Sequence, residues 1–126
     1  MTVTPATYDH VDRAMQECVE ECSTCHHVCL LNTAYCLSVG GAHAEPGHLT
    51  LLSDCADICL TTANLLLRGS EHYEATCAAC LEICRACEAS CAVFRDDVNM
   101  RECGDACRRC AEACERVAAH VKSHTT

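Results

Sequence analysis

Apolar residues recur along the chain with the spacing of one helix face, and short polar or glycine-rich stretches interrupt this pattern at three places. The interruptions are a glycine-rich stretch at 40–47, the pair Gly69–Ser70 and a polar turn at 95–99. The segments between them are rich in Ala, Leu, Glu and Cys, and none alternates like a strand, so all four are predicted to be helices. They span about residues 8–39, 47–68, 71–95 and 100–122.

The connections between these helices are short, and short connections join antiparallel neighbours. The sequence therefore predicts an all-α fold, an antiparallel up-down four-helix bundle, with residues 1–126 forming a single domain. Gly69 should end the second helix and Ser70 should cap the third. Asn99 together with Glu102 resembles a capping box and should begin the fourth helix.

Cysteine supplies 16 of the 126 residues, whereas the chain has three Tyr, one Phe and no Trp. Successive cysteines within a segment are three, four or seven residues apart, so one heptad register per helix places all of them at positions a or d. Random placement would do this roughly once in a hundred thousand trials. The bundle is therefore predicted to have a core lined by cysteine, namely Cys18, Cys22, Cys25, Cys29, Cys36, Cys55, Cys59, Cys77, Cys80, Cys84, Cys87, Cys91, Cys103, Cys107, Cys110 and Cys114.

Thiols stacked on the inward faces of helices indicate metal binding. Residues three or four apart lie about 5–6 Å apart at Cβ, so such a pair can hold one small ion while a facing helix adds a third sulfur. Thiolates select Cu(I), zinc or iron–sulfur clusters. Zinc prefers tetrahedral sites that often include His, and no His occupies an a or d position within the cysteine runs. Iron–sulfur clusters need space for an inorganic core. The predicted cargo is therefore Cu(I), with multiple ions per chain.

Other interpretations of the cysteines remain open at this stage. An iron–sulfur or thiol-redox electron carrier would use a partly exposed reactive pair. A zinc or general metal buffer would use the same thiols, and a structural bundle would carry them incidentally. Disulfides along one helix face would be strained, because the side chains there run nearly parallel. The sequence shows no Ser–His–Asp set, phosphate loop or dinucleotide fingerprint, so we predict a storage protein and not an enzyme.

The charge and the first residues of the chain bear on its partners and its compartment. The formal net charge of −9 makes nucleic acid or an anionic membrane surface an unsuitable partner. Residues 1–15 contain neither a basic start nor an apolar run, so we expect no signal peptide. We also expect no segment long and apolar enough to span a membrane. A cytoplasmic location follows as the expectation, since the cytosol keeps thiols reduced.

The remaining a and d positions differ between the two ends of the predicted bundle. One end should be an apolar plug formed by Val11, Met15, Leu66, Tyr73, Val117 and Val121. The other should present a rim of soft or borderline ligands among Cys36, His48, Leu52, Cys91, Phe94, Met100 and Cys103. We expect His48 and Met100 to be possible ligands where copper enters. Asn32 and Thr62 also occupy d positions, where each could form a hydrogen bond in the core or lend an oxygen to copper.

Three cysteine runs carry a resemblance to a known family: CVEECSTCHHVC, CAACLEICRACEASC and CGDACRRCAEAC. From about Val11 to Val121 the chain resembles the bacterial four-helix-bundle copper storage proteins, in the cytosolic branch that lacks an export signal. The resemblance implies a homotetramer of bundles, each filled with Cu(I) bound mainly by cysteine, and makes all 16 cysteines candidate ligands. The second helix carries only Cys55 and Cys59, so the copper capacity should be skewed toward the other three. Leucines beyond a and d, such as Leu30 and Leu60, fit contacts between subunits.

Overall fold

The computed structural model describes the backbone of residues 12–124 and the side chains of residues 12–119. Within these residues the chain forms four long α-helices and one short 3₁₀ helix, and no strand. In chain order the elements are α1 (Arg13–Val39), η2 (Gly41–Ala44), α2 (Pro46–Leu67), α3 (Tyr73–Ala92) and α4 (Val98–His124).

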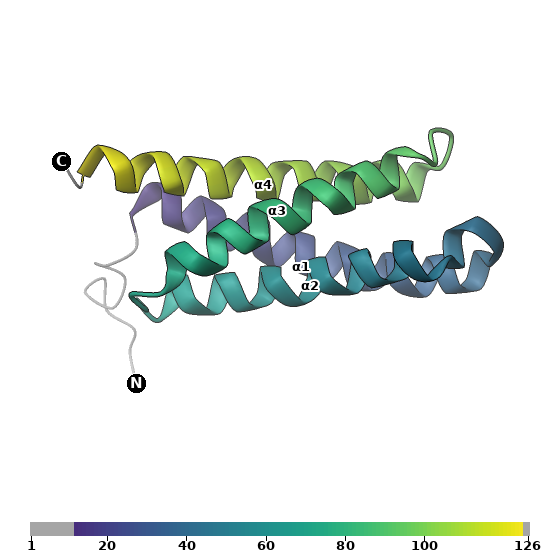
Figure 1. Ribbon diagram of the computed structural model, residues 1–126, viewed down its shortest axis with the longest axis horizontal. Helices are drawn as coiled ribbons and strands as arrows, with labels where there is room; N and C mark the ends of the chain where they lie inside the picture. The colour runs from purple at the N-terminus through teal and green to yellow at the C-terminus, as the bar shows by residue number, and fades with distance from the viewer. Residues whose placement is uncertain (1–11, 125–126) are drawn as a thin grey trace.

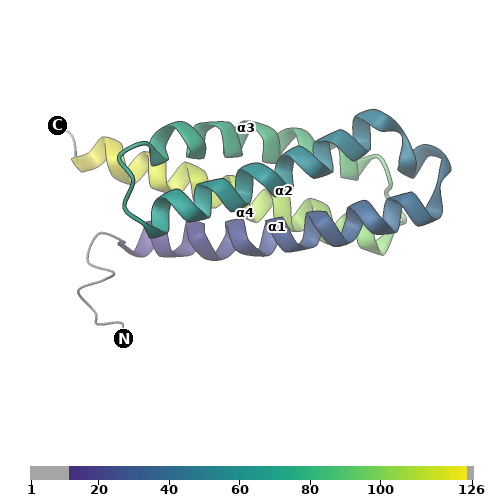
Figure 2. The same ribbon diagram turned by 90° about the horizontal axis from the view of Figure 1, so that it is seen from below.

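The four α-helices form an antiparallel up-down bundle, as predicted. Helix α1 packs against α2 and α4, and α3 packs against the same two helices. Figures 1 and 2 show the α1–α2 and α3–α4 connections at one end of the bundle. The α2–α3 connection lies at the other end, beside the start of α1 and the last turns of α4. Residues in the 40–47 and 93–97 connections are therefore neighbours in space despite their separation in sequence.

Carboxylate side chains begin three of the helices by accepting hydrogen bonds from free backbone N–H groups. Asp12 accepts from the N–H of Met15 at 2.9 Å, and Glu45 accepts from that of His48 at 3.2 Å. At α4 the cap is Asp97, which accepts from the N–H of Met100 at 3.1 Å. The predicted capping box of Asn99 and Glu102 was therefore wrong, because an acidic residue two positions earlier takes the role and both residues lie inside α4.

The third helix is shorter than predicted at both ends. Gly69 ends α2 as expected: with φ of 68° it adopts a left-handed conformation that suits glycine. Ser70 was predicted to cap α3, but its hydroxyl accepts a hydrogen bond from the N–H of His72 inside the turn. His72 occupies the cap position without a side-chain hydrogen bond, and α3 begins at Tyr73.

The core is built mainly from cysteine. All 16 cysteines are buried, and the most exposed of them, Cys77, has 4% of its surface accessible. The fully buried larger side chains include Leu52, Leu66 and Val117, which lie toward the two ends of the cysteine column. The heptad prediction that all cysteines face inward is confirmed. Because a thiol is small and soft, a core of this kind packs four helices closely without aromatic residues.

Leucines lie on the outer face of α1 and α2, where Leu30, Leu31, Leu37, Leu60 and Leu67 are exposed. Helix α2, which includes Leu60 and Leu67, has a mean hydropathy of 1.2 over 18 residues, so by length and composition this helix could cross a membrane. The expectation that no segment meets that criterion was wrong. Core helices of soluble proteins pass the same test, and α2 contributes Cys55, Cys59 and Thr62 to the core of this bundle.

Candidate metal centre

The cysteine sulfurs form a continuous column along the bundle axis. Cys18 and Cys22 are one helical turn apart on α1, and their sulfurs are separated by 3.9 Å. The Sγ atom of Cys22 also lies 3.5 Å from that of Cys110 on α4. Contacts within one helix thus alternate with contacts between helices, so each sulfur can bridge ions at neighbouring levels. Such sharing suits Cu(I), a soft ion that accepts thiolates readily.

The two cysteines of α2 lie at the centre of this column. The Sγ atom of Cys55 is 3.6 Å from that of Cys25 and 3.6 Å from that of Cys84. Cys59 contacts three further sulfurs at 3.6–3.8 Å, on α3 and α4. The sequence prediction gave α2 a lesser share because it carries two cysteines. Their position at the junction of the other three helices was not visible in the sequence.

Five groups of three or four cysteines have sulfurs all within 4.8 Å of one another, among the side chains that the structure describes. They are Cys22–Cys80–Cys110–Cys114, Cys25–Cys55–Cys59–Cys84, Cys25–Cys29–Cys55–Cys107, Cys59–Cys80–Cys84–Cys110 and Cys18–Cys77–Cys114. The cysteines outside these groups are Cys36, Cys87, Cys91 and Cys103. The column is therefore dense in its middle and at the predicted plug end, and sparser toward the opposite end.

Contacts between thiols, together with burial, set the pKa values of the cysteines before any metal arrives. Burial raises the pKa of Cys36 to about 11, so it is a neutral thiol near pH 7. In contacting pairs the effect is reciprocal: the hydrogen bond with Cys107 lowers the pKa of Cys103, and the hydrogen bond with Cys103 raises that of Cys107. A cation that binds here displaces protons, because only thiolates ligate strongly.

The predicted entry-end ligands come together at the sparse end of the column. The Sγ atom of Cys36 lies 3.6 Å from the Nε2 atom of His48 and 3.8 Å from the sulfur of Met100. The Nδ1 atom of His48 shares a hydrogen bond of 2.6 Å with the Ser90 hydroxyl, which fixes the ring orientation. Burial lowers the pKa of His48, which keeps the imidazole neutral and able to donate a lone pair.

These ligands do not form an exposed rim, however. His48 has 4% of its surface accessible, Cys91 has 2%, and Met100 and Cys36 are fully buried. The expectation of soft ligands presented at the surface was therefore wrong. The 40–47 connection and the α3–α4 turn close over this end, and their geometry could not be inferred from helix periodicity.

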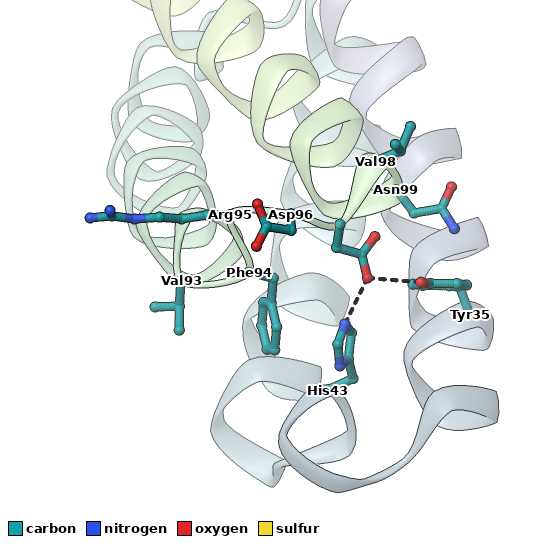
Figure 3. Close-up of a pocket in the computed structure, with 9 residues that line it drawn as sticks. Tyr35, His43, Val93, Phe94, Arg95, Asp96, Val98 and Asn99 are labelled. Atoms are coloured by element: carbon teal, nitrogen blue, oxygen red, sulfur yellow. Dashed lines mark hydrogen bonds and ion pairs between the residues drawn. The ribbon is translucent and has the colours of Figure 1, made fainter.

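A polar cluster in these two connections was missed by the sequence analysis. The hydroxyl of Tyr35 donates to Oδ2 of Asp97 at 2.8 Å, and Nε2 of His43 contacts the same oxygen at 2.8 Å (Figure 3). Partial burial raises the pKa of Asp97, but the hydrogen bonds from Tyr35 and His43 outweigh it and hold the pKa below its ordinary value. The sequence offered one signal of this cluster, because His43 and Asp97 lie in connections at the same end of the predicted bundle.

The remaining candidate positions serve packing. Asn32 donates to the carbonyl of Val28 at 2.9 Å, and Thr62 donates to that of Thr76 at 3.2 Å. Both polar groups thus have partners within the core, in keeping with the hydrogen-bonding interpretation. At the plug end Leu66 and Val117 are buried, and Met15 and Tyr73 are partly buried. The predicted plug residues Val11 and Val121 lie outside the residues whose side chains are described.

Comparison with known families decides the cargo. The family model of the copper storage proteins (Csp) matches residues 11–119, which is nearly the whole chain. The chain belongs to the copper storage protein family. Its function is accordingly the storage of copper and not catalysis. The buried cysteine groups of this copper storage protein fit that function, because they provide several sites for a soft cation.

Solved structures agree with this membership. The copper storage protein Ccsp from Streptomyces lividans, in a structure loaded with 10 copper equivalents, is 33% identical. It superposes with a TM-score of 0.78 over 93% of each chain. The Nmul_A1745 protein from Nitrosospira multiformis is 41% identical, with a TM-score of 0.79 over 86% of this chain and 97% of that one. An uncharacterized cysteine-rich protein from Bacillus subtilis, YhjQ, is 31% identical over 69% of this copper storage protein and 81% of its own length.

Proposed function

We propose that all 16 cysteines hold the stored copper as Cu(I), with about one ion per thiolate at saturation. The observation that supports this most is the column of buried sulfurs, in which the sulfurs of Cys55 and Cys59, the hub of the column, each lie within 4 Å of several others. An ion bound by two or three sulfurs, each shared with a neighbouring ion, gives this ratio. An anaerobic titration of the reduced protein with Cu(I) against a competing chelator tests the assignment.

The supporting chemistry also separates copper from zinc. Four-sulfur groups such as Cys59–Cys80–Cys84–Cys110 could hold a tetrahedral zinc ion. Closed zinc sites would not share their thiolates along the column, so 16 cysteines would hold about four zinc ions if every site used four. A capacity well above that number favours Cu(I), which needs fewer sulfurs per ion.

We propose the cytoplasm as the compartment and a homotetramer as the assembly. Sixteen thiols this close together would oxidise to disulfides in an oxidising compartment, whereas a reducing one keeps them available. The exposed leucines of α1 and α2, Leu30, Leu31, Leu37 and Leu60 among them, supply apolar surface for contacts between copies of the chain.

We propose that copper enters at the end that contains His48 and Met100. An imidazole nitrogen and a thioether bind Cu(I) less tightly than thiolates, so they can pass an ion inward. From there Cys36 is the sulfur that contacts both entry residues, and the cysteines in contact with one another lie further along the bundle. At the opposite end the buried Leu66 and Val117 have no ligand atoms, and the thioether of Met15 is partly buried beside them.

Replacing both entry residues by Leu should slow copper uptake and leave capacity nearly unchanged. The His48→Leu, Met100→Leu variant removes the first ligands but none of the thiolates that retain the ions. Stopped-flow loading from a chelated Cu(I) donor measures the rate, and the copper retained after desalting measures capacity. A matched control is His27→Leu with Met15→Leu, since His27 is exposed and Met15 lies at the plug end. Equal rates in both variants would place entry elsewhere, and a large loss of capacity would make the two residues storage ligands.

A further inference from the structure

The entry end is closed in this structure, although it contains the ligands that copper must meet first. Met100 and Cys36 are fully buried, and His48 is almost so. A Cu(I) ion on a donor molecule cannot contact them until something moves. The covering residues belong to the α1–α2 connection, which contains the short 3₁₀ helix η2, and to the α3–α4 turn. Connections of this kind move more readily than packed helices.

One side chain, Phe94, borders the surface hollows that reach the entry ligands. Three surface pockets at this end, among those formed by the described residues, have Phe94 in their walls. The first, with a volume of about 570 Å³, includes His43. The second, about 410 Å³, reaches Cys91 and Met100, and the third, about 260 Å³, reaches His48. The Phe94 ring thus borders all three hollows, two of which also reach the first ligands of the column.

The Phe94 ring is held in place by a short chain of contacts. Its centroid lies 4.1 Å from that of His43 and 5.1 Å from that of His48. His43 is fixed in turn by Asp97, whose Oδ2 atom also accepts the Tyr35 hydroxyl, both at 2.8 Å. Figure 3 shows the His43 ring beside the Phe94 ring, with His43 and the Tyr35 hydroxyl each joined by a dashed line to the same carboxylate oxygen, which is Oδ2 of Asp97. Tyr35 and Asp97 therefore tie α1 to the turn that carries Phe94.

We propose that Phe94 is a gate for copper exchange, and that Tyr35 and Asp97 hold it shut through His43. The proposal rests on entry at the His48 and Met100 end. Opening requires only that the ring rotate away from His43 or that the turn at 93–97 shift, because the thiolate column behind it stays packed. The ring has no ligand atom, so its role is to control access, and the amount of copper stored does not depend on it.

Two variants test the gate, and both should change the loading rate in the direction opposite to that expected for the His48→Leu, Met100→Leu variant. Phe94→Ala removes the aromatic ring that is proposed as the gate. Tyr35→Phe removes the hydroxyl that donates a hydrogen bond to Asp97. Both should load faster from a chelated Cu(I) donor and release faster to excess chelator, with unchanged capacity. We expect roughly a 2- to 10-fold acceleration for Phe94→Ala, the range set by the strength of aromatic pairs, and a smaller one for Tyr35→Phe. The controls are Val93→Ala, in the same turn but 75% exposed, and Tyr73→Phe at the opposite end.

The outcomes separate the gate from the function on which it rests. Faster exchange in both variants, with controls like the wild type, supports the gate. Unchanged or slower exchange overturns it, even if the His48→Leu, Met100→Leu variant shows that copper enters at this end. If circular dichroism shows that Phe94→Ala does not fold, Tyr35→Phe decides the matter alone by the same criterion. If the wild type retains only one or two copper ions, storage and gate are both overturned.

Discussion

The double variant Cys55→Ala, Cys59→Ala should lose about four copper ions per chain, although it lacks only two thiolates. Each of these sulfurs contacts three others, and together they belong to three of the five cysteine groups found among the described side chains. If each hub thiolate bridges about two ions, its removal leaves two ions short of a ligand. Copper retained after anaerobic loading and desalting, measured by elemental analysis, gives the loss directly.

The matched control is Cys87→Ala, Cys91→Ala, which also removes two buried thiols. Neither residue belongs to one of the five groups, so this variant should lose about half as much copper as the hub variant. Circular dichroism of both apo-proteins checks that the helices are retained. Equal losses in the two variants would mean that the contact density of the column does not determine where copper is held.

The apo-protein should be a folded helical bundle whose melting temperature rises by more than ~20 °C on full loading. Folding without metal is expected because the carboxylate caps at Asp12, Glu45 and Asp97 and the buried Leu52 and Leu66 need no ligand. Copper binds the native arrangement of sulfurs in preference to the unfolded chain. Each site filled at 100 times its dissociation constant adds about 2.7 kcal/mol to the free energy of unfolding. For a domain of this size each kcal/mol raises the melting temperature by about 3–6 °C, so about three filled sites account for the change.

Far-UV circular dichroism during heating, on apo and loaded protein under anaerobic conditions, measures both parts of this expectation. Reduced protein titrated with zinc in place of copper serves as a comparison for non-specific thiol binding. An apo chain without helical signal would contradict the result, because the metal would then create the fold. A loaded protein that melts at the apo temperature would show that copper is bound outside the native core.

Helix periodicity was sufficient to predict the inward face of each helix. The burial of Cys22 on α1, Cys80 on α3 and Cys110 on α4 follows from one heptad register per helix, because residues three and four apart share a face. The level of each cysteine along the axis could not be predicted in the same way. It depends on how the connections stagger the helices, so the central position of Cys55 and Cys59 became visible only in the structure.

Features formed between connections were the least predictable. Asp97 lies more than 50 residues from both Tyr35 and His43, and each side chain alone has an ordinary role on a helix face or in a loop. Their meeting requires the 40–47 stretch to fold over the α3–α4 turn, which the hydrophobic pattern does not specify. The same local geometry buried His48, which helix position alone had placed at an open rim.

Copper storage by the cysteine core is tested most directly by titrating the reduced apo-protein with Cu(I), without oxygen, in the presence of a chromogenic Cu(I) chelator. We expect the protein to withhold copper from the chelator until about one ion per cysteine has been added, that is close to 16 per chain, and the chelator complex to appear only beyond that point. Appearance of the chelator complex after one or two equivalents per chain would contradict storage by the thiolate column.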